Sequence, residues 1–103
     1  MVKHIIAWNF KKGFTQVENL ENARKMKEYL EDLANKIPNV VSLKVYYDSL
    51  STSDADIILI SEFKSEEDLK AYIDHPEHKK VVEFNKTVAE NRRCFDFFIK
   101  EGE

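Results

Sequence analysis

The sequence predicts an α+β domain in which one four-stranded antiparallel sheet carries its helices on one face, the ferredoxin-like arrangement. Three observations lead to this class. Four apolar segments have the length of strands, three segments have helical periodicity, and they follow one another in the order β-α-β-β-α-α-β. The chain has 103 residues, so residues 1–103 are expected to form a single domain with one core.

The first part of the chain is predicted as a strand and a long helix. Lys3–Phe10 (KHIIAWNF) is rich in isoleucine and aromatic residues and ends at a turn that contains glycine. Thr15 and Glu18 then have the spacing of a capping box, which indicates the start of a helix. Apolar residues recur every three or four positions as far as Ile37, and Pro38 ends the helix.

The rest of the chain is predicted as three strands and two shorter helices. The strands are Val40–Tyr47, Asp56–Phe63 and Arg93–Lys100. Ser65 caps a short helix, and Pro76 occupies the first turn of another, whose inward-facing residues extend to Ala89. The second helix of the ferredoxin-like arrangement is therefore expected to be broken at a proline.

Composition and charge exclude several classes of protein. The net charge is −3, and the third strand has no lysine, arginine or glycine, so a nucleic-acid partner is not expected. No apolar run approaches the roughly 20 residues of a membrane span, and charged residues interrupt the N-terminal apolar stretches where a signal peptide would lie. The single cysteine cannot form an internal disulfide. These features favour a cytoplasmic protein without a membrane partner.

The strands predict a second copy of the chain as the partner. Apolar side chains alternate onto both faces of the first, third and last strands, although helices are expected to cover one face. The face left over includes Ile5, Ala7, Ile58 and Ile60. A two-fold homodimer through this face would cover it, and a monomer with an exposed apolar sheet is the alternative.

Four polar residues are candidates for chemistry. His4 lies on the same side of the first strand as the apolar residues that alternate with it, and Asp96 interrupts the apolar segment CFDFFI. Tyr72 lies on the short helix, and His78 begins the inward face of the next. In the functional interpretation His78 is a general base that Asp96 orients, and Tyr72 donates a hydrogen bond to a developing oxyanion. In the structural interpretation His78 ties the helix start to Asp96, and Tyr72 is a core aromatic residue.

A metal site and a cofactor are not expected from the sequence. His75 and His78 have i, i+3 spacing, but Pro76 separates them onto differently directed segments. The chain has neither an HExxH motif nor a pair of cysteines. Cys94 is expected to be an inert thiol.

Five segments carry a resemblance to a known family. KHIIAWNFK, IPNVVSLKV, SDADIILISEF, DLKAYIDHPEHKKVVEF and FDFFI resemble, in order along nearly the whole chain, the stress-responsive α/β-barrel (Dabb) family. This resemblance implies a homodimer in which two four-stranded sheets close into a barrel with the helices outside. Many members of the family have no known activity.

One plant branch of the family, the polyketide cyclases of the olivetolic-acid-cyclase type, resembles this chain at the candidate site. Its YxxHPxH segment supplies an acid/base pair that matches Tyr72 and His78, and its first-strand histidine and last-strand acid match His4 and Asp96. The resemblance implies an intramolecular aldol condensation. The chain departs from the branch at Ile57, where that branch has a histidine.

The expected ligand pocket lies between the sheet and the helices. Its predicted lining is Ile6, Trp8, Met26, Leu30, Leu59, Ile73, Val81 and Val82, and the wall that Met26 and Leu30 form differs from that of the plant cyclases. The first functional hypothesis is cofactor-free acid/base chemistry, of aldol or lyase type, on a small carbonyl compound. The alternatives are a non-catalytic, stress-associated dimer or binder of small ligands and, by analogy of fold, a cofactor-free monooxygenase.

Overall fold

A computed structural model describes residues 1–100, so the end of the predicted domain, residues 101–103, lies outside the described residues. The described elements are β1 (Val2–Phe10), α1 (Gln16–Lys36), β2 (Ser42–Tyr46), β3 (Ile57–Phe63), α2 (Glu66–Asp74), α3 (Pro76–Val88) and β4 (Ala89–Phe98). This order confirms the predicted ferredoxin-like class.

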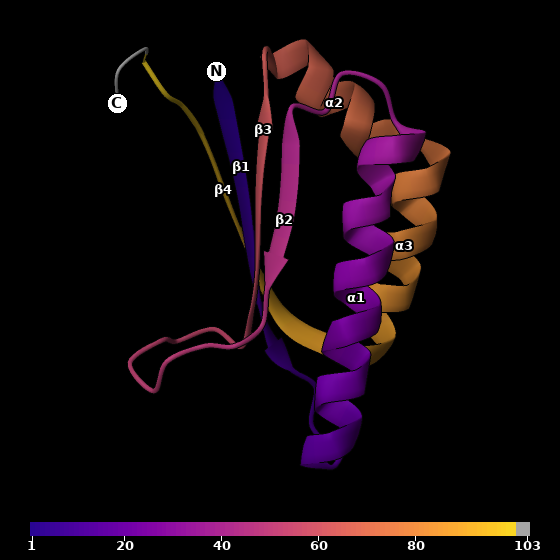
Figure 1. The fold of residues 1–103 in the computed structure, drawn as a ribbon, viewed down its shortest axis with the longest axis vertical. Coiled ribbons are helices and arrows are strands. Elements are labelled where there is room, and N and C mark those ends of the chain that lie inside the picture. The colour runs from indigo at the N-terminus through magenta and orange to yellow at the C-terminus, as the bar shows by residue number, and fades with distance from the viewer. Residues whose placement is uncertain (101–103) are drawn as a thin grey trace.

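The strands form one antiparallel sheet in the order β2-β3-β1-β4. The three helices lie on the same side of this sheet, with α1 and α3 running side by side (Figure 1). We call this side of the sheet the helix side and the opposite side the outer face. The topology brings the first and last strands of the chain together, although they are far apart in the sequence.

The helix side over β2 and β3 is a closed apolar core. Alternation along β3 turns Ile57, Leu59 and Phe63 towards the helices, and each of them is buried. The capping box predicted at Thr15 and Glu18 is present and begins α1. The buried face of α1 consists of Ala23, Met26, Leu30 and Leu33.

Two side chains of α1 occupy the exposed edge of β2. Lys27 Nζ donates to the backbone carbonyl of Val45 at 2.8 Å, and the Val45 N–H donates to Glu31 Oε2 at 2.9 Å. Lys27 and Glu31 also pair with each other at 2.7 Å. Because the backbone groups of Val45 are satisfied, this part of the edge is not open to pairing with another strand.

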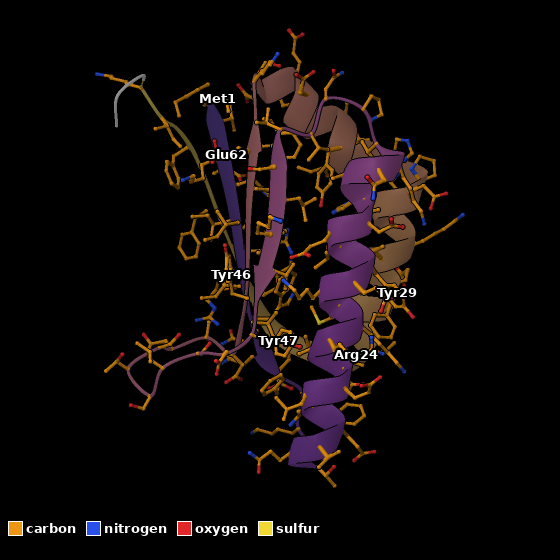
Figure 2. The ribbon with its side chains drawn as sticks, viewed as in Figure 1. Met1, Arg24, Tyr29, Tyr46, Tyr47 and Glu62 are labelled. Carbon is orange, nitrogen blue, oxygen red and sulfur yellow. The ribbon has the colours of Figure 1, made fainter. Side chains whose placement is uncertain are left out.

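The outer face of the sheet carries an uncovered apolar surface. Tyr46 and Tyr47 extend to opposite sides of the sheet, Tyr46 to the outer face and Tyr47 towards the core (Figure 2). On β4 the outer-face residues Phe95 and Phe97 are 51% and 46% exposed. Ile5 lies between Phe95 and Ile60 in the register, so these side chains form one continuous surface.

The last strand begins earlier than the sequence analysis predicted. Ala89, expected on the inward face of the preceding helix, has extended backbone and pairs with Phe10, so β4 starts there. Asn91 adopts a φ of 56°, and the register between β1 and β4 shifts between Ala7 and Asn9. This irregularity hides the strand pattern, because it breaks the alternation on which a strand prediction depends.

The bounds of β2 and the end of β4 also differ from the prediction by a few residues, and β1 and β3 differ by one residue at their starts. β2 is Ser42–Tyr46 rather than Val40–Tyr47, and β4 ends at Phe98 rather than Lys100. Within residues 1–100, none of the helices has the combination of length and apolar character that crossing a membrane would require.

Candidate functional site

The candidate site lies on the helix side of β1 and β4, where α2 meets α3. The helices close over β1 here, so that His4 is 2% exposed. They leave β4 open, and the Asp96 side chain on the same side of the sheet is 41% exposed. The site is therefore at a boundary between the core and solvent.

His4 and Asp96 form a hydrogen-bonded pair across the two strands. The register places them directly opposite each other, and His4 Nδ1 donates to Asp96 Oδ1 at 2.5 Å. The backbone carbonyl of His4 accepts a hydrogen bond from the buried hydroxyl of Ser61 on β3 at 2.9 Å. The imidazole of His4 is thus bonded to the edge strand β4, and its backbone is bonded to the side chain of Ser61 on the interior strand β3.

The pairing of Asp96 with His4 corrects the expected pairing of Asp96 with His78. The Nδ1 of His78 lies 3.0 Å from the backbone carbonyl of Ile73, at the end of α2. A carbonyl oxygen only accepts, so Nδ1 carries the proton and Nε2 is the unprotonated nitrogen of the neutral ring. The orienting group for His78 is therefore a backbone carbonyl and not a carboxylate.

The environment of His78 favours its neutral form. Partial burial lowers its pKa, against the opposing effect of the hydrogen bond to Ile73, and nearby positive charge, including Arg92, lowers it further. A neutral imidazole with a defined tautomer has the properties of a general base at neutral pH.

Tyr72 lies between the two histidines. Its ring centroid is 4.6 Å from that of His78 and 6.3 Å from that of His4, and it also contacts Phe63 at 5.1 Å. Tyr72 is completely buried, and within residues 1–100 its hydroxyl has no hydrogen-bonding partner. Burial raises its pKa, so the phenol remains protonated and is a donor without an acceptor.

Cys94 joins this site, although the sequence analysis treated it as an inert thiol. Its Sγ donates to Asp96 Oδ2 at 3.4 Å and lies 3.8 Å from His4 Nδ1. Burial raises the pKa of the thiol, and the hydrogen bond to Asp96 adds to the effect. The sequence does indicate that Cys94 and Asp96 lie on the same side of one strand. Their contact with His4, however, depends on the register of β1 and β4, which the sequence does not show.

A hollow of about 230 Å³ opens beside the site, which we call the β4 hollow. Its lining is Val2, Glu66, Leu69, Lys70, Ile73, Asp96, Phe97 and Phe98. It includes Ile73, which holds His78, and Asp96, which holds His4. A ligand in this hollow would therefore contact Ile73 and Asp96, the hydrogen-bonding partners of His78 and His4, whereas His78, Tyr72 and His4 lie behind its lining.

The residues predicted to line a pocket are divided by the structure. Five of them belong to the packed core, namely Ile6, Trp8, Met26, Leu30 and Leu59. Ile73 lines the β4 hollow, Val81 lines a hollow between α1 and α3, and Trp8 and Val82 line a further one beside the start of β4. The centre of the predicted pocket is therefore packed, and the hollows lie at its edge.

His75 has a structural task at the helix junction. Its Nδ1 accepts the backbone N–H of Glu77 at 3.1 Å and so caps α3. His75 and His78 consequently have different partners, as expected from Pro76 between them.

Known proteins match this chain both through a family model and among solved structures. The family model described as the stress responsive A/B barrel domain (Dabb) matches residues 2–99. A search of the curated proteins found no match. Among solved structures, a dimeric protein of unknown function and ferredoxin-like fold from Bacteroides fragilis is 30% identical, with a TM-score of 0.87 and 95% of each chain covered.

Two plant structures are more distant in sequence. A protein from Arabidopsis thaliana is 22% identical, with a TM-score of 0.81, and the match covers 100% of this chain and 99% of that one. Hydroxynitrile lyase from Passiflora edulis is 18% identical, with a TM-score of 0.76, and the match covers 99% of this chain and 95% of that one. At these identities the similarity shows the fold.

Proposed function

The chain belongs to the stress-responsive α/β-barrel (Dabb) family, and from that premise we propose that it performs cofactor-free acid/base chemistry on a small carbonyl compound. The reaction class is removal of a proton next to a carbonyl group, followed by aldol-type bond formation or its reverse. Hydroxynitrile lyase has the same fold, which supports a reaction of this general kind as one that the fold accommodates.

The observation that carries the proposal is the state of His78. The hydrogen bond from Nδ1 to Ile73 leaves Nε2 as the basic nitrogen, and the lowered pKa keeps the ring neutral. In the proposed reaction, Nε2 takes the proton from the carbon next to the carbonyl. The enolate carbon then attacks a second carbonyl carbon, and the resulting alkoxide takes the proton back from His78.

Tyr72 supplies the complementary donor. Its hydroxyl lacks an acceptor among the described residues, and its raised pKa keeps it protonated, so a substrate oxygen would satisfy it as negative charge develops. Because Tyr72 is completely buried, a substrate in the β4 hollow reaches the hydroxyl only by displacing side chains around it.

The test is the exchange of carbon-bound protons of β-keto thioesters and simple ketones in D₂O, followed by NMR. We expect exchange above the buffer rate, reduced about 10²- to 10⁴-fold in His78→Gln and about 10²-fold or more in Tyr72→Phe. Denaturation curves for each variant separate loss of chemistry from loss of folding.

The matched control is His75→Asn. His75 is at the same helix junction, and asparagine is also a good N-cap residue, so α3 should keep its start. This variant should exchange protons as fast as the parent protein. If the parent does not exceed the buffer rate on any compound, or if His78→Gln matches the parent, the residues are structural.

We also propose that the active form is a homodimer that covers the outer face. Ile5, Ile58 and Ile60 lie on this face, whereas Ala7 is already buried in the single chain and adds little area. The 30% identical protein from Bacteroides fragilis is described as dimeric, which supports the proposal.

Sedimentation equilibrium tests the dimer. We expect the mass of two chains for the parent and of one chain for Ile60→Lys, because a lysine there would lie beside Lys44 in the covered face. Val17→Lys, at an exposed position on α1, is the control and should remain dimeric. A parent protein with the mass of one chain would rule out the dimer.

A further inference from the structure

Three side chains of the metal-ligating type meet on the helix side of β1 and β4. Asp96 is opposite His4 in the register and Cys94 is opposite Ile6, so all three side chains leave the sheet on the same side. One ligand atom from each of His4, Cys94 and Asp96 lies within 4.8 Å of the others. Because its residues come from the first and the last strand, the cluster cannot be recognised as a sequence motif.

Two of the three separations within the cluster are close to those of a tetrahedral ligand set. Around Zn²⁺, neighbouring nitrogen, oxygen and sulfur ligands are about 3.4 to 3.6 Å apart. Cys94 Sγ lies 3.8 Å from His4 Nδ1 and 3.4 Å from Asp96 Oδ2. The third separation, from His4 Nδ1 to Asp96 Oδ1, is 2.5 Å, the length of a hydrogen bond through a proton. Exchange of that proton for a metal ion requires this pair to open by about 1 Å.

We propose that His4, Cys94 and Asp96 bind a divalent transition-metal ion of the zinc class, with one coordination position left open. The ligand types are the nitrogen, thiolate and carboxylate donors that Zn²⁺ and Co²⁺ accept together. A bound thiolate and carboxylate bring two negative charges to the ion, so the charge of the set is balanced.

The surroundings of His4 preorganise the site. The backbone of His4 is bonded to Ser61, and its ring packs against Phe63 and Tyr72 with centroid separations of 6.4 and 6.3 Å. Asp96 and Cys94 are on the exposed edge strand and have the freedom to adjust to an ion. With a rigid histidine and two adaptable ligands, movement of Asp96 supplies the opening of about 1 Å that the His4–Asp96 pair requires.

The cluster borders accessible space. Asp96 lines the β4 hollow, so a water molecule or a small oxygen-containing ligand there would lie against one of the three ligands and could complete the coordination. Three protein ligands with an exchangeable fourth are typical of reactive rather than purely structural zinc sites. The inference goes beyond the proposed function, because neither His78 nor Tyr72 contributes a ligand to it.

Cobalt(II) is the probe, added without oxygen to protein that has been treated with a chelator. The chain has one cysteine, so a thiolate-to-cobalt absorption band would report Cys94 alone. We expect this band to saturate at one Co²⁺ per chain and to disappear when Zn²⁺ displaces the cobalt. Cys94→Ser should abolish the band, and Asp96→Asn should weaken cobalt binding about 10- to 100-fold.

Three further variants complete the design. His4→Gln should also weaken binding, but His4 is buried, so its circular dichroism spectrum must first match that of the parent. Asp48→Asn, in the exposed loop after β2, is the control for Asp96 and should bind cobalt as the parent does. His78→Gln should also leave the band unchanged, which separates this site from the proposed catalytic base.

Two results would overturn the inference. One is the absence of the thiolate band when Co²⁺ is in excess over folded parent protein. The other is a band that saturates at one Co²⁺ per two chains and is insensitive to Asp96→Asn, because that would mean an ion bridged between exposed Cys94 thiols of two molecules.

Discussion

The helix side of the sheet is closed over β3 and open over β4. On β3 the residue Phe63 is fully buried, and it packs against Tyr72 of α2. On β4 the residue Phe98, which is paired with Val2 on the same side of the sheet, is 71% exposed. Two phenylalanines on one side of one sheet therefore have opposite environments.

The cause is the position of the helices relative to the twisted sheet. α1 packs on β2, and α2 contacts β1 and β3, while β4 diverges from the helices at the end that carries the C-terminus (Figure 1). Polar side chains consequently lie at the boundary between the part of the sheet that the helices cover and the part that they leave exposed. His4 is on the covered side of that boundary, and Asp96 and Cys94 are on the open side.

The first prediction tests this contrast directly and has the largest expected effect. Phe63→Ala should lower the free energy of unfolding by about 3 to 5 kcal/mol, because it leaves a cavity in a closed core. Phe98→Ala should change it by less than about 0.5 kcal/mol. Urea denaturation of both variants measures the difference, and equal losses would show that β4 is covered as well as β3.

The second prediction concerns the buried bond that joins β3 to the site. Ser61→Ala removes the hydroxyl that donates to the His4 carbonyl and should lower the free energy of unfolding by about 1 kcal/mol. Ser42→Ala, at the start of the edge strand β2, should have an effect below about 0.5 kcal/mol. Thermal unfolding of the two variants provides the comparison, and a neutral Ser61→Ala would contradict it.

The third prediction uses the unpartnered hydroxyl of Tyr72. Tyr72→Phe should leave the free energy of unfolding unchanged within about 0.5 kcal/mol or raise it slightly, because no hydrogen bond among the described residues is lost. The measurement is again urea denaturation. A loss above about 1 kcal/mol would mean that the hydroxyl has a partner in the folded protein, such as a bound water molecule.

The fourth prediction concerns pH. Burial lowers the pKa of His78 in the folded protein below its ordinary value of 6.5, so the unfolded chain binds more protons in acid. Stability should therefore fall as the pH decreases through and below 6.5, and His78→Gln should fall less steeply. Denaturation curves between neutral and mildly acidic pH measure both slopes, and identical slopes would contradict the assignment.

Local pattern was sufficient to predict the elements and much of the core. The capping box at Thr15 and Glu18 and the helical spacing up to Leu33 predicted α1, because both are set by neighbours a few residues apart. The alternation of Ile57, Leu59 and Phe63 predicted the buried side of β3. The same reasoning failed at Ala89 and Asn91, where a register shift interrupts the alternation.

The candidate site was predicted in part. His4, Tyr72 and His78 are close together, as expected, but Asp96 pairs with His4 and His78 is bonded to Ile73. Cys94 was set aside because nothing near it in the sequence indicates a partner. The distinction between these contacts depends on which residues of β1 and β4 lie opposite one another.

The sequence by itself determined the order of the elements, the face that α1 buries and the presence of apolar residues on both sides of the sheet, because these properties depend on residues adjacent along the chain. Only the tertiary structure decided that the helices leave β4 uncovered and that His4, Cys94 and Asp96 form one cluster. Those outcomes depend on sheet twist and strand register, which arise from packing between distant segments.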